Sequence, residues 1–168
     1  MKLLVSITCI TFNQESYIAE AIESFLMQKT NFDFEIIIGE DCSTDGTRKI
    51  IEEYRTKFPE KIKLITSSQN VGMMHNFFRT LHHSKGKYIA ICEGDDYWTD
   101  SYKLQKQVDF LESHPEYNVC AHETIIRNDF DSKENGTLFS RANFNSYIDI
   151  SKRKHYTFED TLTGNIFH

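Results

Sequence analysis

Two adjacent carboxylates, Asp95 and Asp96, are the residues of this chain that are best suited to chemistry. They follow an apolar run, residues 87–92, which predicts a short buried strand that ends before a glycine. In α/β proteins the end of such a strand opens into the crevice where ligands bind. Two carboxylates there repel each other unless a cation or hydrogen-bond donors compensate, and hard divalent cations take oxygen ligands that they share with phosphates. The pair therefore indicates a metal–diphosphate site, and the alternative is a solvated turn in which an aspartate caps the next helix.

The ends of two other predicted strands carry residues that complement such a site. Residues 3–10 are apolar and β-branched and precede the polar and aromatic run 11–15, while residues 34–38 precede Asp41. Because the carboxyl ends of parallel strands share one edge of a sheet, we expect these side chains to lie near Asp95. An aromatic ring such as Phe12 can stack on a nucleobase, and a fixed carboxylate can accept from a base N–H or a ribose hydroxyl. The sequence has no glycine-rich phosphate loop, so a metal ion would have to hold the phosphates.

Strand and helix patterns alternate along most of the chain. Strands are predicted at residues 3–10, 34–38, 61–66, 87–92 and 118–126, and helices at about residues 16–27, 44–58, 72–84 and 101–113. Such alternation predicts an α/β fold in which helices cover both faces of a mostly parallel sheet. After residue 127 the chain becomes polar and aromatic, and only a short helix at 156–162 is predicted there. We therefore expect a ligand-binding part, residues 1–126, and the start of a second region, residues 127–168.

Composition limits the class of protein and of partner. The 168 residues suit one domain, and 39% hydrophobic and 13% aromatic residues predict a folded chain. The net charge of −6 argues against nucleic acid as a main partner, because neutralising phosphates needs a basic face. The four cysteines lie far apart without a C-x-x-C pair, which is typical of reduced thiols. There is neither a signal peptide nor an apolar stretch of the ~20 residues that span a bilayer, so we expect a cytoplasmic location, with or without an anchor to the membrane outside this chain.

Four motifs, taken in order, resemble those of the GT-A glycosyltransferases of family 2. They lie at residues 5–13, 35–47, 70–76 and 86–96, and the resemblance extends over about residues 3–126. It implies a Rossmann-like GT-A fold and an inverting transfer of a sugar from a nucleotide diphosphate sugar to an acceptor hydroxyl. It also implies Mn²⁺ or Mg²⁺ as cofactor, favours a UDP-sugar donor, and points to saccharide or lipid-linked acceptors in cell-surface polysaccharide or glycan biosynthesis.

The resemblance also assigns roles to particular residues. The residue at Phe12 packs on the base, the one at Asp41 hydrogen-bonds the base, and the acidic pair contacts the ribose through Asp95 and the metal through Asp96. The residues expected to bind the donor are Thr11, Phe12, Asn13, Glu15, Asp41, Asn76 and Asp95, and the expected metal ligands are Asp95 and Asp96. Glu15 has an alternative role as an acid near a helix N-terminus. The chain departs from the family pattern in having Glu40 and Glu93 where Asp is common, and His75 where Arg often precedes Asn76.

The acceptor side is the part of the site that the sequence does not supply. Related catalytic domains continue well past this length, so we expect the general base beyond residue 168 and name no catalytic residue within the chain. Glu159 and Asp160 lie in the first turn of a predicted helix, where acids favour the helix dipole. We expect apolar surface around Ile166 and Phe167 to favour self-association. Two alternatives remain open: a nucleotidyltransferase acting on a sugar phosphate, and a nucleotide-binding module without turnover.

Overall fold

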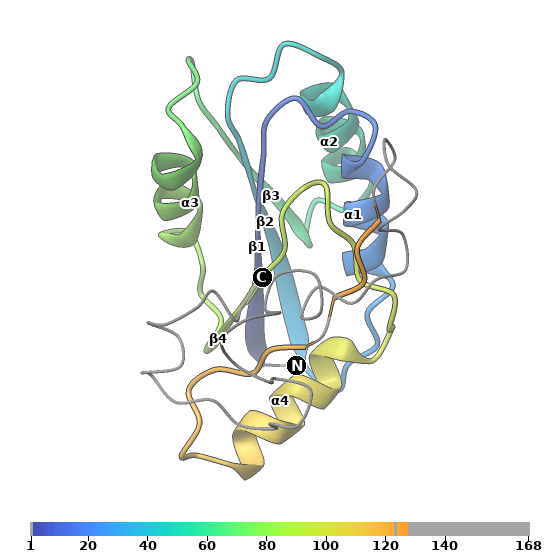
Figure 1. Cartoon of the computed structure of the whole chain (residues 1–168), viewed down its shortest axis with the longest axis vertical. Helices are drawn as coiled ribbons and strands as arrows, with labels where there is room; N and C mark the ends of the chain where they lie inside the picture. Colours follow the sequence, from blue (N-terminus) through green and yellow to red (C-terminus); the bar gives the residue numbers. More distant parts are fainter. Residues whose placement is uncertain (1, 123, 128–168) are drawn as a thin grey trace, which may run out of the picture. The chain divides into compact units, whose positions relative to one another are not determined.

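The computed structural model describes residues 2–122 and 124–127, and its contacts divide the chain into two compact units, residues 1–115 and 116–168. In chain order the first unit contains β1 (Leu3–Thr11), α1 (Ile18–Leu26), β2 (Asp33–Glu40), α2 (Thr47–Lys57), β3 (Ile62–Thr66), α3 (Met73–Leu81), β4 (Tyr88–Ile91) and α4 (Lys103–Ser113) (Figure 1). The predicted helix at 156–162, the acids Glu159 and Asp160, and the apolar pair Ile166 and Phe167 lie outside the described residues. None of the helices that the structure describes is long and apolar enough to cross a membrane.

The four strands form one parallel sheet in the order β3-β2-β1-β4. This arrangement confirms the predicted α/β class. In the registers, Thr11 of β1 lies opposite Glu40 of β2, and Thr8 lies opposite Ile91 of β4. The carboxyl ends of all four strands therefore meet at one edge, which is the edge that the polar residues of the motifs follow.

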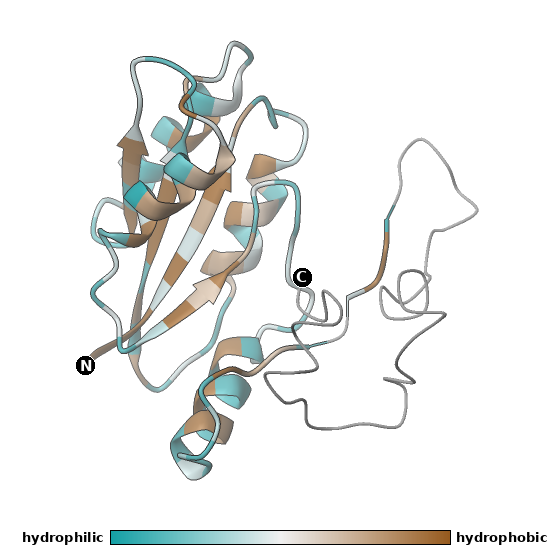
Figure 2. Ribbon diagram, turned by 60° about the vertical axis from the view of Figure 1, so that its left-hand side comes forward, coloured by the Kyte–Doolittle hydropathy of each residue, from teal (hydrophilic) through white to brown (hydrophobic). Residues whose placement is uncertain are grey.

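Helices cover both faces of the sheet, as the alternation predicts. Figure 1 shows α3 on one side of the strands and α1 and α2 on the other. Figure 2 shows the strands as mainly apolar and the helices as mixed, which is the pattern of a buried parallel sheet under amphipathic helices.

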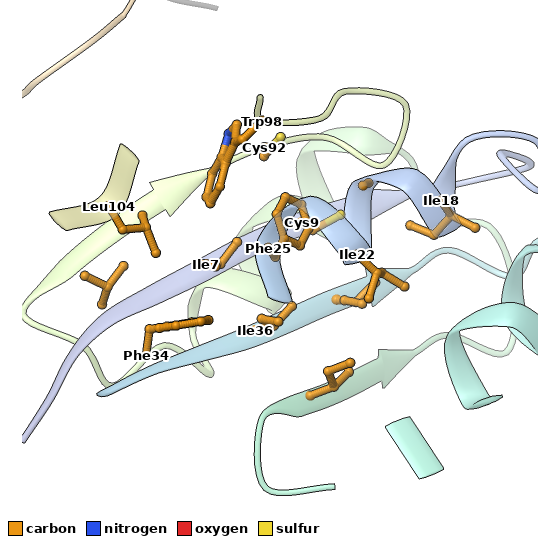
Figure 3. Close-up of a cluster of buried hydrophobic side chains, with 14 of the residues drawn as sticks. Ile7, Cys9, Ile18, Ile22, Phe25, Phe34, Ile36, Cys92, Trp98 and Leu104 are labelled. Atoms are coloured by element: carbon orange, nitrogen blue, oxygen red, sulfur yellow. The ribbon is translucent and has the colours of Figure 1, made fainter. Parts of the chain in front are cut away.

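The main hydrophobic core lies between α1 and the sheet. Figure 3 shows Ile22 and Phe25 of α1 over Ile7 and Ile36, all four of them with no exposed surface. Trp98 closes this cluster, with its ring centroid 5.0 Å from that of Phe25. Fully burying each such side chain contributes about 1.5–3 kcal/mol to the free energy of folding, so this layer is a main source of the stability of the fold.

On the opposite face α3 approaches β2 closely because of a glycine. A Cβ added at Gly39 would overlap the hydroxyl of Thr80 and lie 2.7 Å from Oδ1 of Asn76. Only glycine leaves the room that this approach requires. The polar underside of α3 is thereby brought to the end of β2, where the motif residues begin.

The prediction of a fifth strand at 118–126 is wrong for the residues that the structure describes there. Only Ile125 makes an isolated bridge, and no strand forms. Val119 and Ile125 are both 62% exposed, so burial does not stabilise an extended conformation in this segment. An apolar run forms a strand only where a neighbouring strand pairs with it and another layer buries its side chains.

Candidate functional site

Backbone hydrogen bonds join the segments that follow β1, β2 and β4. The N–H of Asp41 donates to the carbonyl of Thr11 over 3.1 Å, and the N–H of Gly94 donates to the carbonyl of Ile10 over 3.0 Å. Pairing with β1 thus continues past Ile91 as far as Gly94, and Asp95 is the next residue. The structure brings Thr11, Asp41 and the segment before Asp95 to one edge, as the sequence predicts.

Asn13 bonds the loop after β1 to the loop after β2. Its N–H donates to Oγ of Ser43 over 3.0 Å, and its Oδ1 accepts from the N–H of Thr44 over 2.8 Å. Asn13 and Cys42 both have positive φ angles, 54° and 61°. Asparagine tolerates this left-handed conformation, whereas for cysteine it costs on the order of 1–2 kcal/mol. The hydrogen bonds between the loops hold this backbone in place.

Glu15 makes a second connection between the same loops. Its N–H donates to Oδ2 of Asp45 over 3.1 Å, and its own carboxylate accepts from the N–H of Gly46, the residue that precedes α2. The N–H of Thr47 also donates to Asp45, over 3.0 Å. Partial burial raises the pKa of Asp45, but the hydrogen bonds from Thr47 and Glu15 outweigh it, so the pKa is lowered from its ordinary value. The carboxylate of Glu15 thus lies at a helix N-terminus, as its alternative role requires, and its contact with a donor stays a prediction.

Phe12 and Thr11 present different surfaces at the end of β1. Phe12 is 42% exposed, although it is a large apolar side chain beside buried residues. Its exposure suits a ring on which a planar ligand can stack. Thr11 is 3% exposed, and its hydroxyl has no hydrogen-bond partner among the described residues.

The carboxylate of Asp41 is buried and holds the loop that leads into α3. It is 2% exposed; Oδ1 accepts from the N–H of Val71 and Oδ2 from the N–H of Gly72, both over 2.9 Å. Gly72 has a φ of 85°, which a residue with a side chain rarely adopts. Asp41 therefore connects the end of β2 to the start of α3, and it lies beside the segment that carries Phe12.

Asn76 and Arg79 of α3 complete this part of the site. Nδ2 of Asn76, a residue 2% exposed, donates to the carbonyl of Gly39 over 2.8 Å. Nε of Arg79 donates to Oδ1 of Asn76 over 2.9 Å, and Nη2 lies 3.7 Å from Oδ1 of Asp41. Sequence reasoning did not identify Arg79. Helical spacing could have identified it, because positions 75, 76 and 79 lie on one face of a helix. An arginine one turn after His75 can therefore reach the same edge of the sheet.

Asp95 and Asp96 occupy a turn that packs against the end of β1. The N–H of Asp96 donates to the carbonyl of Glu93 over 3.2 Å; Asp95 is exposed and Asp96 is half-buried. A Cβ added at Gly94 would lie 2.5 Å from Oε1 of Gln14 and 2.8 Å from Cβ of Thr11, so glycine is required at this approach. The turn is consequently held against β1 while the carboxylates remain outside the core.

The donor set of this turn suits a hard divalent cation that binds together with phosphates. Asp95 and Asp96 offer only oxygen, and the described residues contain no group of three His, Cys, Asp or Glu side chains that could hold a metal. Mg²⁺ and Mn²⁺ favour such ligands, and Mg²⁺ is commonly held by one or two carboxylates while substrate phosphates and water complete the shell. The residues present therefore fit a metal ion that is bound jointly with a diphosphate.

The neighbouring Cys92 and Trp98 are structural. Burial, assisted by the charge of Asp96, raises the pKa of Cys92 to about 12, so the thiol is neither a nucleophile nor a soft metal ligand near neutral pH. Its S–H donates to the carbonyl of Asp96 over 3.6 Å, which ties the turn to the core. Trp98 is 5% exposed and packs in the core cluster, so it serves the core and does not line the ligand edge.

Comparisons with known proteins agree with this geometry. The model of the family described as "Glycosyl transferase family 2" matches residues 6–167. An uncharacterized protein of Mycobacterium tuberculosis is 48% identical over 118 residues, which cover 70% of this chain and 34% of that protein. An uncharacterized glycosyltransferase of Nostoc is 34% identical over 126 residues, which cover 75% of this chain and 38% of the relative.

Solved structures show the same likeness. The crystal structure of Staphylococcus aureus TarS 1-349 in complex with UDP matches with a TM-score of 0.59 and 30% identity, over 68% of this chain and 33% of that one. The chain thus spans about a third of the length of the mycobacterial relative and of TarS 1-349. The chain has a parallel α/β sheet with carboxylates and an aromatic ring at one edge, and the family model matches nearly its whole length. The chain therefore belongs to glycosyl transferase family 2 and has the GT-A fold.

Proposed function

We propose that this chain forms the donor-binding part of a metal-dependent, inverting glycosyltransferase that takes a uridine diphosphate sugar. The observation that supports this proposal most is the gathering of Phe12, Asp41 and the Asp95–Asp96 turn at one edge of the sheet. TarS, 30% identical to this chain, was solved with UDP and with UDP-GlcNAc, which favours a uridine donor here.

Each of these residues has a proposed role. The base stacks on Phe12 and donates an N–H to Asp41, and Asp95 accepts from a ribose hydroxyl. Thr11, Asn13, Glu15 and Asn76 complete the predicted donor-binding set, and their buried or bonded side chains fix its shape. Asp96, with Asp95, would hold Mn²⁺ or Mg²⁺, which would supply positive charge to offset the charge that develops on the diphosphate leaving group.

The acceptor end of the reaction is proposed to lie beyond residue 168. A base there takes the proton of a saccharide or lipid-linked hydroxyl, which attacks the anomeric carbon from the face opposite the diphosphate. TarS is named a poly(ribitol-phosphate) beta-N-acetylglucosaminyltransferase, so we propose that the whole protein acts in the synthesis of a cell-surface polymer.

The test is calorimetric titration of the chain with UDP, once in Mn²⁺ and once in EDTA. We expect tight binding only with the metal, and we expect Asp96→Asn to remove the difference between the two buffers. Asp109→Asn, the same change on α4 where Asp109 accepts from Gln105, is the matched control and should preserve the difference. Equal UDP affinity in both buffers would contradict the metal-dependent site. Binding by a full-length protein that transfers no sugar would favour the module without turnover.

A further inference from the structure

Arg79 is held rigidly at the end of β2 by three different groups. Its Nε donates to Oδ1 of Asn76 over 2.9 Å, and its Nη2 donates to the carbonyl of Glu40 over 2.7 Å. Nη2 also forms an ion pair with Asp41, at 3.7 Å from Oδ1. The side chain is 24% exposed, and the guanidinium spans the gap between α3 and the strand that it covers.

The carboxylate of Asp41 has three neighbours, two backbone N–H groups and the guanidinium of Arg79, and together they restrict which of its lone pairs a ligand can reach. A carboxylate has about four lone-pair sites, two on each oxygen. Val71 donates to Oδ1, which also faces the Arg79 guanidinium, and Gly72 donates to Oδ2. These two hydrogen bonds fill one site on each oxygen, and the Arg79 guanidinium, at ion-pair distance, lies beside the second site of Oδ1. Oδ2 is therefore the oxygen that is left open to a hydrogen bond from a ligand. A carboxylate that is 2% exposed and fixed in this way offers a single acceptor in a single direction.

We propose that Arg79 is a positioning residue that sets which nucleobases the site accepts. This inference rests on the proposed function, because it takes Asp41 to be the group that reads the base. A single fixed acceptor favours a base with an N–H at that place and disfavours one with a lone pair there, since an unpaired buried acceptor is costly. Without Arg79, Oδ1 loses its cation, and the second site of that oxygen opens to a ligand or to water. Base selection then relaxes, although Arg79 itself acts only through Asp41.

Arg48 provides a matched control for the test. It carries the same charge near the same strand end, where its Nε lies 3.8 Å from Oε2 of Glu40 and 3.4 Å from Oε1 of Glu52. No described contact joins it to Asp41. Arg48→Gln therefore removes a cation from this region without touching the carboxylate whose orientation is in question.

The experiment measures the dissociation constants of UDP, GDP, ADP and CDP in Mn²⁺ by calorimetry, for the unaltered chain, Arg79→Gln, Arg79→Lys and Arg48→Gln. We define the selectivity ratio as the dissociation constant of the nucleotide that binds most weakly divided by that of the one that binds most tightly. Arg79→Gln should reduce this ratio by about tenfold, the factor for one charge-assisted hydrogen bond between a base and Asp41. The effect of Mn²⁺ on UDP binding should persist. Arg79→Lys should recover part of the ratio, because an ammonium can pair with Asp41 but cannot make the other two bonds at once. Arg48→Gln should leave the ratio unchanged.

The possible outcomes separate the two proposals. If Arg79→Gln weakens every nucleotide by the same factor, Arg79 only stabilises the fold and the positioning role is refuted. Should that variant fail to fold, Arg79→Met decides, because it keeps an unbranched side chain without the charge and an unaltered ratio there refutes the role equally. If the unaltered chain binds no nucleotide with Mn²⁺, the proposed function itself fails and the inference with it.

Discussion

Replacing Phe12 by alanine tests the base end of the site with little disturbance of the fold. The ring is 42% exposed, so its removal should cost far less folding free energy than the about 3–5 kcal/mol of a buried phenylalanine. One aromatic ring stacked on one base contributes about 1–3 kcal/mol of affinity, which corresponds to a roughly 5- to 150-fold increase in the dissociation constant for UDP. Calorimetry of UDP in Mn²⁺ measures this change directly.

Phe58 supplies the matched control for this substitution. It is 40% exposed and lies just after α2, so Phe58→Ala removes the same ring at almost the same exposure. UDP affinity should be unchanged in that variant. Inorganic pyrophosphate with Mn²⁺ should bind equally to the unaltered chain and to Phe12→Ala, because it has no base to stack. The reasoning would be refuted if the two alanine variants weakened UDP equally, or if Phe12→Ala also weakened pyrophosphate.

Three further predictions concern the loops, the α3 contact and catalysis. Asp45→Ala should lower the free energy of unfolding by about 0.5–2 kcal/mol at pH 7. Because the folded-state pKa of Asp45 is lowered from 3.8, the loss of stability should be complete above pH 3.8 and should disappear as the pH falls through the folded-state pKa. Urea unfolding of both proteins at several pH values measures this loss. Gly39→Ala should destabilise the chain by about 1–3 kcal/mol through overlap with Thr80, and the double variant with Thr80→Ala should regain part of the loss if the overlap is the cause. The 168-residue chain should transfer sugar about 10²–10⁴-fold more slowly than a version extended at its C-terminus, because losing a general base costs that much; equal rates would place the base within this chain.

The elements that could be predicted from the sequence are those whose pattern is local. Apolar runs followed by glycine or polar residues predicted all four strands of the sheet, and helical spacing predicted α1 to α4 to within a few residues. Parallel topology then placed Thr11, Asp41 and Asp95 at one edge. The false strand at 118–126 shows the limit of this reasoning, because an apolar run does not reveal whether a neighbouring strand exists to receive it.

The contacts that the sequence did not reveal join residues far apart in the chain. Glu15 accepts from Gly46, and Arg79 contacts Asp41, across separations that depend on strand register and on how closely α3 approaches β2. Composition and periodicity specify neither quantity. The contact between Asp45 and Thr47 is local by comparison, since the two residues lie only two positions apart in the chain.

The hydrogen bonds between the loops after β1 and β2 also constrain how long those loops can be. Asn13 and Glu15 find their partners at Thr44 and Gly46, each 31 positions further along the chain. One residue inserted in either loop would move the side chains of Asn13 and Glu15 out of register with the N–H groups that they accept from. The two loops could therefore change length only if both changed by the same amount. Residues 68–70, which are exposed, carry no such restriction from these bonds. Insertions are therefore expected to be tolerated at residues 68–70, before α3. In the loops after β1 and β2 they should disrupt the fold, because the hydrogen bonds there require a fixed loop length.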